Sequence, residues 1–111
     1  MDAPVDTEPT LDMADLEQQA RQAATLLRML GNESRLLVLC HIVGAGEMSV
    51  GALAELVGLS QPALSQHLAK MREEGLLATR REAQSVYYRL ADEKATRLLR
   101  LMRQLYCGPD A

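Results

Sequence analysis

The sequence has no phenylalanine or tryptophan and only three tyrosines, so its hydrophobic residues, 48% of the 111, are nearly all aliphatic. Leucine and alanine predominate, and since both favour helices we predict a mainly α protein. The two cysteines, Cys40 and Cys107, are too few for a disulfide-stapled fold. No apolar run approaches the roughly 20 residues of a membrane span, and the start of the chain lacks the pattern of a secretion signal. We therefore expect a cytoplasmic protein of one domain, with no membrane partner.

Basic residues are missing from the first 20 positions, which hold six acidic residues. The formal charge of −3 therefore conceals a charge of +3 on the remainder of the chain. Because residues 1–11 also contain two prolines, we predict a disordered acidic arm there, one domain over 12–108 and a short tail over 109–111. The acidic total thus does not exclude a nucleic-acid partner.

Hydrophobic periodicity, together with the positions of glycine and proline, predicts five helices and a β-hairpin. The expected helices cover 12–30, 33–43, 49–57, 61–74 and 92–106, and the expected strands cover 77–81 and 86–90. Candidate N-cap residues are Asn32, Ser49 and Ser60.

Two of these helices have distinct apolar patterns. The helix at 33–43 is apolar almost all round, which is typical of a buried helix. The short helix at 49–57 is expected to turn Leu53, Leu56 and Val57 inward.

The helices at 49–57 and 61–74, joined by a short glycine-containing turn, form a helix-turn-helix pattern. Leu64, Leu68 and Met71 recur at i, i+4 and i+7 on the second helix, so they must face the core. No acidic residue occurs from position 59 to position 71. The opposite face therefore offers donors and small side chains for base edges and phosphates, and its candidate DNA-binding residues are Ser60, Gln61, Pro62, Ser65, Gln66, Ala69 and Lys70.

The hairpin after this helix adds three more DNA-binding candidates: Arg80, Arg81 and Gln84. A solvated polar face would be the simpler interpretation of a single amphipathic helix. A basic hairpin directly after a helix-turn-helix favours DNA binding instead, because recognition helix and wing recur together in DNA-binding proteins.

From about Leu16 to Tyr106 the chain resembles the ArsR/SmtB family of dimeric winged-helix repressors. The similarity is carried by LLRMLGNESRLLVLC and by SVGALAELVGLSQPALSQHLAKMREEGLLATRREAQSVYYRL. It implies a winged helix-turn-helix of order helix-helix-helix-helix-strand-strand-helix, with LSQPALSQHLAKMREEGL as the recognition helix and RREAQSVYYRL as the wing. It also implies a homodimer through the first and last helices, and an inverted-repeat operator whose half-sites lie about 34 Å apart. Such a protein is a regulator and not an enzyme.

The tip of the wing departs from the family, which often has glycine after an acidic residue where this chain has Ala83. Alanine is strained in a tight primed turn, so we expect a longer or differently shaped loop.

Many members of the family bind a metal, but the residues for such a site are few here. The segment SVGALAELVG lacks the cysteines of one family site, and the last helix has Asp92 and Glu93 without a histidine. Cys40, His41 and Cys107 remain, and a soft-metal site needs three or four ligands. Cys40 and His41 are adjacent, so their side chains diverge by about 100° on a helix. We expect neither a metal nor another cofactor.

The cysteine positions resemble the persulfide-responsive SqrR/BigR-type branch of the family. That branch has one cysteine in a run like RLLVLC, ending here at Cys40, and a second after an aromatic residue, as in QLYC ending at Cys107. The resemblance implies a redox-sensing pair that reactive sulfur species convert to a disulfide or polysulfide bridge, which releases the operator.

Other interpretations of the two cysteines remain open. Cysteine is often buried, so Cys40 is also explained as plain core. An ArsR-type repressor of this kind could respond to peroxide, or to a metal held by both thiols and an outside ligand. A thiol-redox enzyme is disfavoured because no CxxC motif occurs, and a dimerisation module without DNA is disfavoured by the acid-free helix.

Overall fold

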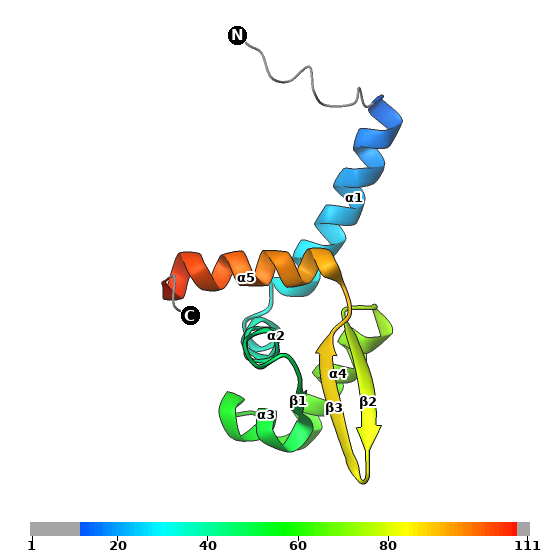
Figure 1. Cartoon of the computed structure of the whole chain (residues 1–111). Coiled ribbons are helices and arrows are strands. Elements are labelled where there is room, and N and C mark those ends of the chain that lie inside the picture. Colours follow the sequence, from blue (N-terminus) through cyan, green and yellow to red (C-terminus); the bar gives the residue numbers. More distant parts are fainter. Residues whose placement is uncertain (1–11, 109–111) are drawn as a thin grey trace.

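The computed structural model describes residues 12–108, which form five helices and three strands (Figure 1). The predicted arm over 1–11 and the tail over 109–111 lie outside the described residues. In chain order the elements are α1 (Met13–Leu30), α2 (Glu33–Ala45), β1 (Met48–Ser49), α3 (Val50–Val57), α4 (Gln61–Glu73), β2 (Leu77–Glu82), β3 (Ser85–Leu90) and α5 (Glu93–Cys107).

The predicted N-caps are confirmed. Asn32 accepts a hydrogen bond from the Arg35 amide, Ser49 from the Ala52 amide and Ser60 from the Ala63 amide. Each cap satisfies an amide that has no partner within its own helix. The turn between α3 and α4 passes through Gly58, whose φ of 71° is the left-handed conformation that favours glycine.

The predicted hairpin is confirmed, but a third strand was missed. β1 pairs antiparallel with β3, so the sheet has the order β1-β3-β2. β1 has only two residues, and its second residue is also the N-cap of α3. Such a segment is too short to show the alternation by which strands are recognised in a sequence.

Of the two alternatives predicted for the wing tip, a longer or a differently shaped loop, the longer loop was wrong. Glu82 pairs with Ser85, which leaves a two-residue connection of Ala83 and Gln84. Ala83 adopts a φ of 56°, the left-handed conformation that is unfavourable for a residue with a Cβ. The continuous ladder from Leu77 to Glu82 holds the tight turn in spite of this strain.

The core surrounds α2, as the apolar sequence of this helix predicted. Val38, Leu39 and Ile42 of α2 have no exposed surface. The core is completed by side chains from the other elements: Leu53, Leu64, Leu68, Met71, Leu76, Leu77, Ala95 and Leu99, with Leu30 at the end of α1. One inward prediction was wrong, because Leu56 is 53% exposed on the outer side of α3.

α1 and α5 lie on one side of this body. α5 crosses over α2, whereas α1 points away from the rest of the chain (Figure 1). Much apolar surface of both helices is exposed, including Leu16 and Leu27 of α1 and Leu101, Leu105 and Tyr106 of α5. No helix within residues 12–108 combines the length and hydropathy needed to cross a bilayer.

Candidate functional site

The outward face of α4 carries the residues proposed for DNA contact. Leu64, Leu68 and Met71 are fully buried, as their spacing predicted, and this fixes the rotation of the helix. The seven candidates from Ser60 to Lys70 are all exposed. Ser60 also caps the helix, so the first turn of α4 presents amides and a polar face together.

Lys70 is the main cation of this face. Its ammonium lies 3.9 Å from a carboxylate oxygen of Glu74, and its side chain is 55% exposed. An ion pair at that distance and exposure is weak, so it leaves Lys70 able to reach a phosphate.

The wing is fastened to the turn between α2 and β1. The Arg80 guanidinium donates to both carboxylate oxygens of Glu47, from Nε at 2.8 and 3.1 Å and from Nη2 at 2.6 Å. It also pairs with Glu82 and lies over the Tyr87 ring, 4.6 Å from the centroid. The hydrogen bonds from Arg80 lower the pKa of Glu47, which keeps this carboxylate charged.

The three wing candidates thus differ. Arg81 and Gln84 are exposed, whereas Arg80 is exposed but engaged with two carboxylates. Glu47 was not predicted, since it lies 33 residues from Arg80 in the sequence and belongs to no motif.

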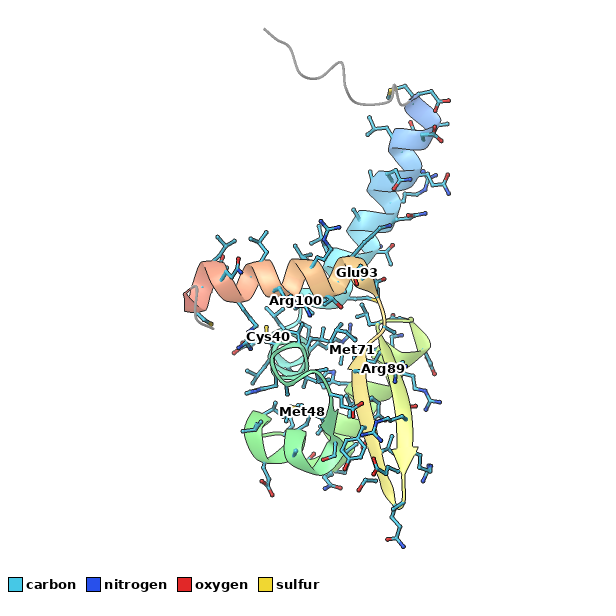
Figure 2. All side chains as sticks on the ribbon, in the orientation of Figure 1. Cys40, Met48, Met71, Arg89, Glu93 and Arg100 are labelled. Carbon is cyan, nitrogen blue, oxygen red and sulfur yellow. The ribbon has the colours of Figure 1, made fainter. Side chains whose placement is uncertain are left out.

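The two cysteines come from elements that cross. Cys40 lies on the side of α2 that faces α5 (Figure 2), and Cys107 is the last residue of α5. Both are free thiols; Cys40 is half-buried and Cys107 is exposed. Burial raises the pKa of the Cys40 thiol, Arg103 opposes this increase, and Cys107 adds to it. Both cysteines thus lie on the two helices that pack against each other, α2 and α5.

Arg103 joins α5 to α2 at this point. Its Nη1 donates to the Cys40 carbonyl oxygen at 2.8 Å. Gly44 makes the approach possible, because a Cβ at that position would lie 2.9 Å from Nη1. The sequence suggested Arg35 and His41 as neighbours of Cys40, and Arg103 was missed because it is 63 residues away. Its position four residues before Cys107, on the same side of α5, was the available signal.

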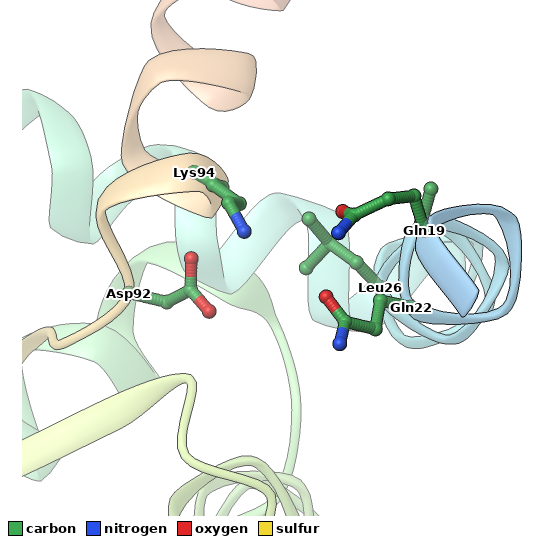
Figure 3. A pocket seen from close by; sticks show the side chains of 6 residues that line it. Gln19, Gln22, Leu26, Asp92 and Lys94 are labelled. Atoms are coloured by element: carbon green, nitrogen blue, oxygen red, sulfur yellow. The ribbon is translucent and has the colours of Figure 1, made fainter. Parts of the chain in front are cut away.

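A cavity of about 240 Å³ lies between α1 and the start of α5, away from the cysteines (Figure 3). Gln19, Gln22 and Leu26 line it from α1, and Asp92 and Lys94 from the other side. The Asp92 carboxylate is already the N-cap of α5, accepting from the Ala95 amide at 2.9 Å. In the described part of the chain, no three His, Cys, Asp or Glu side chains are grouped so that they could hold a metal ion.

The sequence profile of the bacterial regulatory proteins of the arsR family matches residues 32–79, which include the helix-turn-helix. A curated relative, the biofilm growth-associated repressor of Xylella fastidiosa, is 38% identical over 105 residues, covering 95% of this chain and 91% of the relative. The chain belongs to the ArsR family. The winged helix-turn-helix predicted from the sequence is the fold of this ArsR-family regulator.

Other similar proteins are also transcriptional regulators. The transcriptional activator HlyU of Vibrio cholerae is 41% identical over 97 residues, covering 87% of this chain and 89% of the relative. The solved structure of reduced HlyU from the same species superposes with a TM-score of 0.81 at 42% identity, covering 86% of this chain and 99% of that one. These relatives are transcriptional regulators and not enzymes, and regulators of the ArsR family bind operator DNA, typically as dimers.

Proposed function

We propose that this ArsR-family regulator is a homodimeric repressor that senses reactive sulfur species through Cys40 and Cys107. The observation that carries the proposal is the contact of α5 with α2 at Cys40: Arg103, four residues before Cys107, donates to the Cys40 carbonyl oxygen at 2.8 Å. Two relatives support parts of the proposal. The Xylella fastidiosa relative is named a repressor, and the solved structure of Vibrio cholerae HlyU is described as reduced.

DNA binding is assigned to the exposed face of α4 and to the wing. Gln66 and Ser65 offer hydrogen bonds to base edges, Ala69 allows close approach, and Lys70 supplies charge for a phosphate. Of the wing, Arg81 and Gln84 are free to contact the backbone or the minor groove. Arg80 holds the hairpin in place through Glu47, so its role is to position the wing.

The dimer follows from the exposed apolar surface. α1 has 18 residues, and only Leu30 at its end is buried. Most of a helix's stability in a protein comes from packing of its apolar face, so we expect a second copy to cover the apolar side chains of α1 and Leu101 and Leu105 of α5. Two recognition helices about 34 Å apart then require an inverted-repeat operator.

The thiol chemistry starts at Cys107. Its sulfur is exposed, whereas the raised pKa of Cys40 leaves less thiolate at neutral pH. The Cys107 thiolate attacks the sulfane sulfur of an organic persulfide, RSSH, and RS⁻ leaves. The Cys40 thiolate then attacks the inner sulfur of the Cys107 persulfide, expelling HS⁻ and forming the disulfide.

Two thiols lose two electrons in this sequence, and the sulfane sulfur gains them as sulfide. If Cys40 is itself first converted to a persulfide, its outer sulfur attacks the inner sulfur of the Cys107 persulfide and expels HS⁻. The extra sulfur atom then stays between the two cysteines as a polysulfide bridge.

A bridge between α2 and α5 acts on the layer that also forms the dimer. A shift of α5 against α2 changes the separation of the two recognition helices, and this is the two-state element that both DNA and oxidant bias. A 100-fold loss of operator affinity needs a coupling free energy of about 2.7 kcal/mol, which is a typical size for allosteric coupling.

The test compares the wild-type protein with Cys40→Ser and Cys107→Ser. Each reduced protein is treated separately with an organic persulfide, hydrogen peroxide and zinc, and is then analysed by mass spectrometry and operator binding. We expect persulfide to release the wild-type protein from operator DNA and to release neither variant. Release of either variant from the operator by persulfide would contradict the two-cysteine bridge. Release of the wild type by peroxide or zinc, and not by persulfide, would show that the inducer is not a reactive sulfur species.

The DNA assignment has its own test. Replacing both Gln66 and Lys70 by alanine should lower the affinity for the operator and should make that affinity less dependent on salt concentration. An unchanged affinity and salt dependence would refute recognition through α4.

A further inference from the structure

A cavity of about 240 Å³ lies between α2 and α5, and one residue of its lining, Arg103, donates to the Cys40 carbonyl oxygen. Val43 and Gly44 line it from α2, and Arg100, Arg103 and Gln104 line it from α5. Figure 2 shows Arg100 on the part of α5 that passes over α2, the helix that carries Cys40. The cavity therefore combines two guanidinium groups and an amide from the part of α5 that leads to Cys107.

No Asp or Glu of the described residues lines this cavity. α5 has no acidic residue after Glu93 in its first turn, and α2 has only Glu33, also in its first turn. Glu33 is ten residues before Val43, about 15 Å along the helix. Arg100 has no ion pair among the described residues, and Arg103 uses one N–H on the Cys40 carbonyl, which leaves further donors for an anion.

Arg103 lies away from the exposed leucines of α5, Leu101 and Leu105. Arg103 and Leu105 are two residues apart, so their side chains diverge by about 160°, and the same holds for Cys107 and Leu105. Leu105 therefore lies on the opposite side of α5 from Arg103 and Cys107. Arg103 and Cys107 are one helical turn apart, about 6 Å along the axis.

We propose that this cavity binds the carboxylate of a low-molecular-weight organic persulfide and so places the sulfane sulfur at Cys107. The inference rests on the dithiol switch proposed above. Guanidinium groups hold carboxylates through paired hydrogen bonds, and the one-turn spacing matches a donor whose carboxylate and sulfur are separated by a few bonds. The bound donor transfers its outer sulfur to the Cys107 thiolate and departs as the carboxylate-bearing thiolate.

The test compares three persulfides of similar size, made from 3-mercaptopropionate, 2-mercaptoethanol and cysteamine, which are anionic, neutral and cationic at the far end. The initial rate of Cys107 modification in the reduced dimer is followed by mass spectrometry of quenched samples. We expect the anionic donor to react about 5-fold faster than the neutral one and the cationic donor to react slowest. Raising the ionic strength from about 0.01 M to about 1 M should remove most of the difference, because the screening length falls from about 30 to about 3 Å.

Arg100→Gln should reduce the 5-fold preference to about 2-fold or less without changing the rate of the neutral donor. Arg97→Gln is the matched control, since it removes the same charge from the same helix outside the cavity. Equal rates for the three donors, or an equal effect of both substitutions, would overturn the anion site and leave the switch intact. If no donor forms a bridge in the wild type, the switch fails and the anion site fails with it.

Discussion

Gly44→Ala tests whether the contact between α5 and α2 tunes the buried thiol. The new Cβ would lie 2.9 Å from Arg103 Nη1, 3.1 Å from Cζ and 3.2 Å from Nη2. The first distance is shorter than any normal contact, so the guanidinium must move away. We expect this shift to lengthen or break its hydrogen bond to the Cys40 carbonyl.

Two opposing terms keep the effect on stability small. Loss of the hydrogen bond costs about 0.5–1.5 kcal/mol, and replacing a helical glycine by alanine contributes about 0.8–1.0 kcal/mol in favour of folding. The free energy of unfolding should therefore change by less than about 1 kcal/mol. The pKa of Cys40 should rise further, because Arg103 is the group that lowers it.

The assay is the pH dependence of Cys40 alkylation in the Cys107→Ser background, with urea unfolding as the measure of stability. Gly51→Ala is the control, since a Cβ there meets nothing within 4 Å. It should leave the pKa of Cys40 unchanged. An unchanged or lower pKa of Cys40 in Gly44→Ala would refute the role given to Arg103.

Three further predictions concern the wing, the DNA-binding face and the core. Ala83→Gly should raise the free energy of unfolding by up to about 1 kcal/mol, measured by thermal unfolding at fixed protein concentration, because it relieves a positive φ; a lower melting temperature would contradict this. Lys70→Gln should reduce the slope of log operator affinity against log salt by about 1.8 per dimer, from two lost phosphate contacts, while Arg100→Gln leaves the slope unchanged. Leu68→Ala should destabilise the fold by about 2–5 kcal/mol in urea unfolding, whereas Leu56→Ala, at an exposed position, should cost far less; equal losses would contradict the assigned core.

Local signals in the sequence were sufficient for the helices and for the buried and exposed sides of α4. The N-caps at Asn32, Ser49 and Ser60 and the inward stripe of α4 depend only on neighbouring residues, and all were predicted correctly. β1 was missed because its pairing with β3 is set by tertiary structure and not by its own two residues.

The features that could not be predicted join distant parts of the chain. Arg80 meets Glu47, and Arg103 meets the carbonyl of Cys40, across 33 and 63 residues. No periodicity or motif encodes such contacts. Leu56 was placed inward because it fits a helical stripe, but α3 is short and only Leu53 of this helix is fully covered.

The most direct test of the account is peptide mapping of the persulfide-treated protein together with operator binding by the same sample. The account predicts a linked pair of peptides that contains Cys40 and Cys107 of one protomer, and a loss of operator affinity that reducing agent reverses. Release from the operator without this linked pair, or the linked pair with full operator affinity, would contradict it.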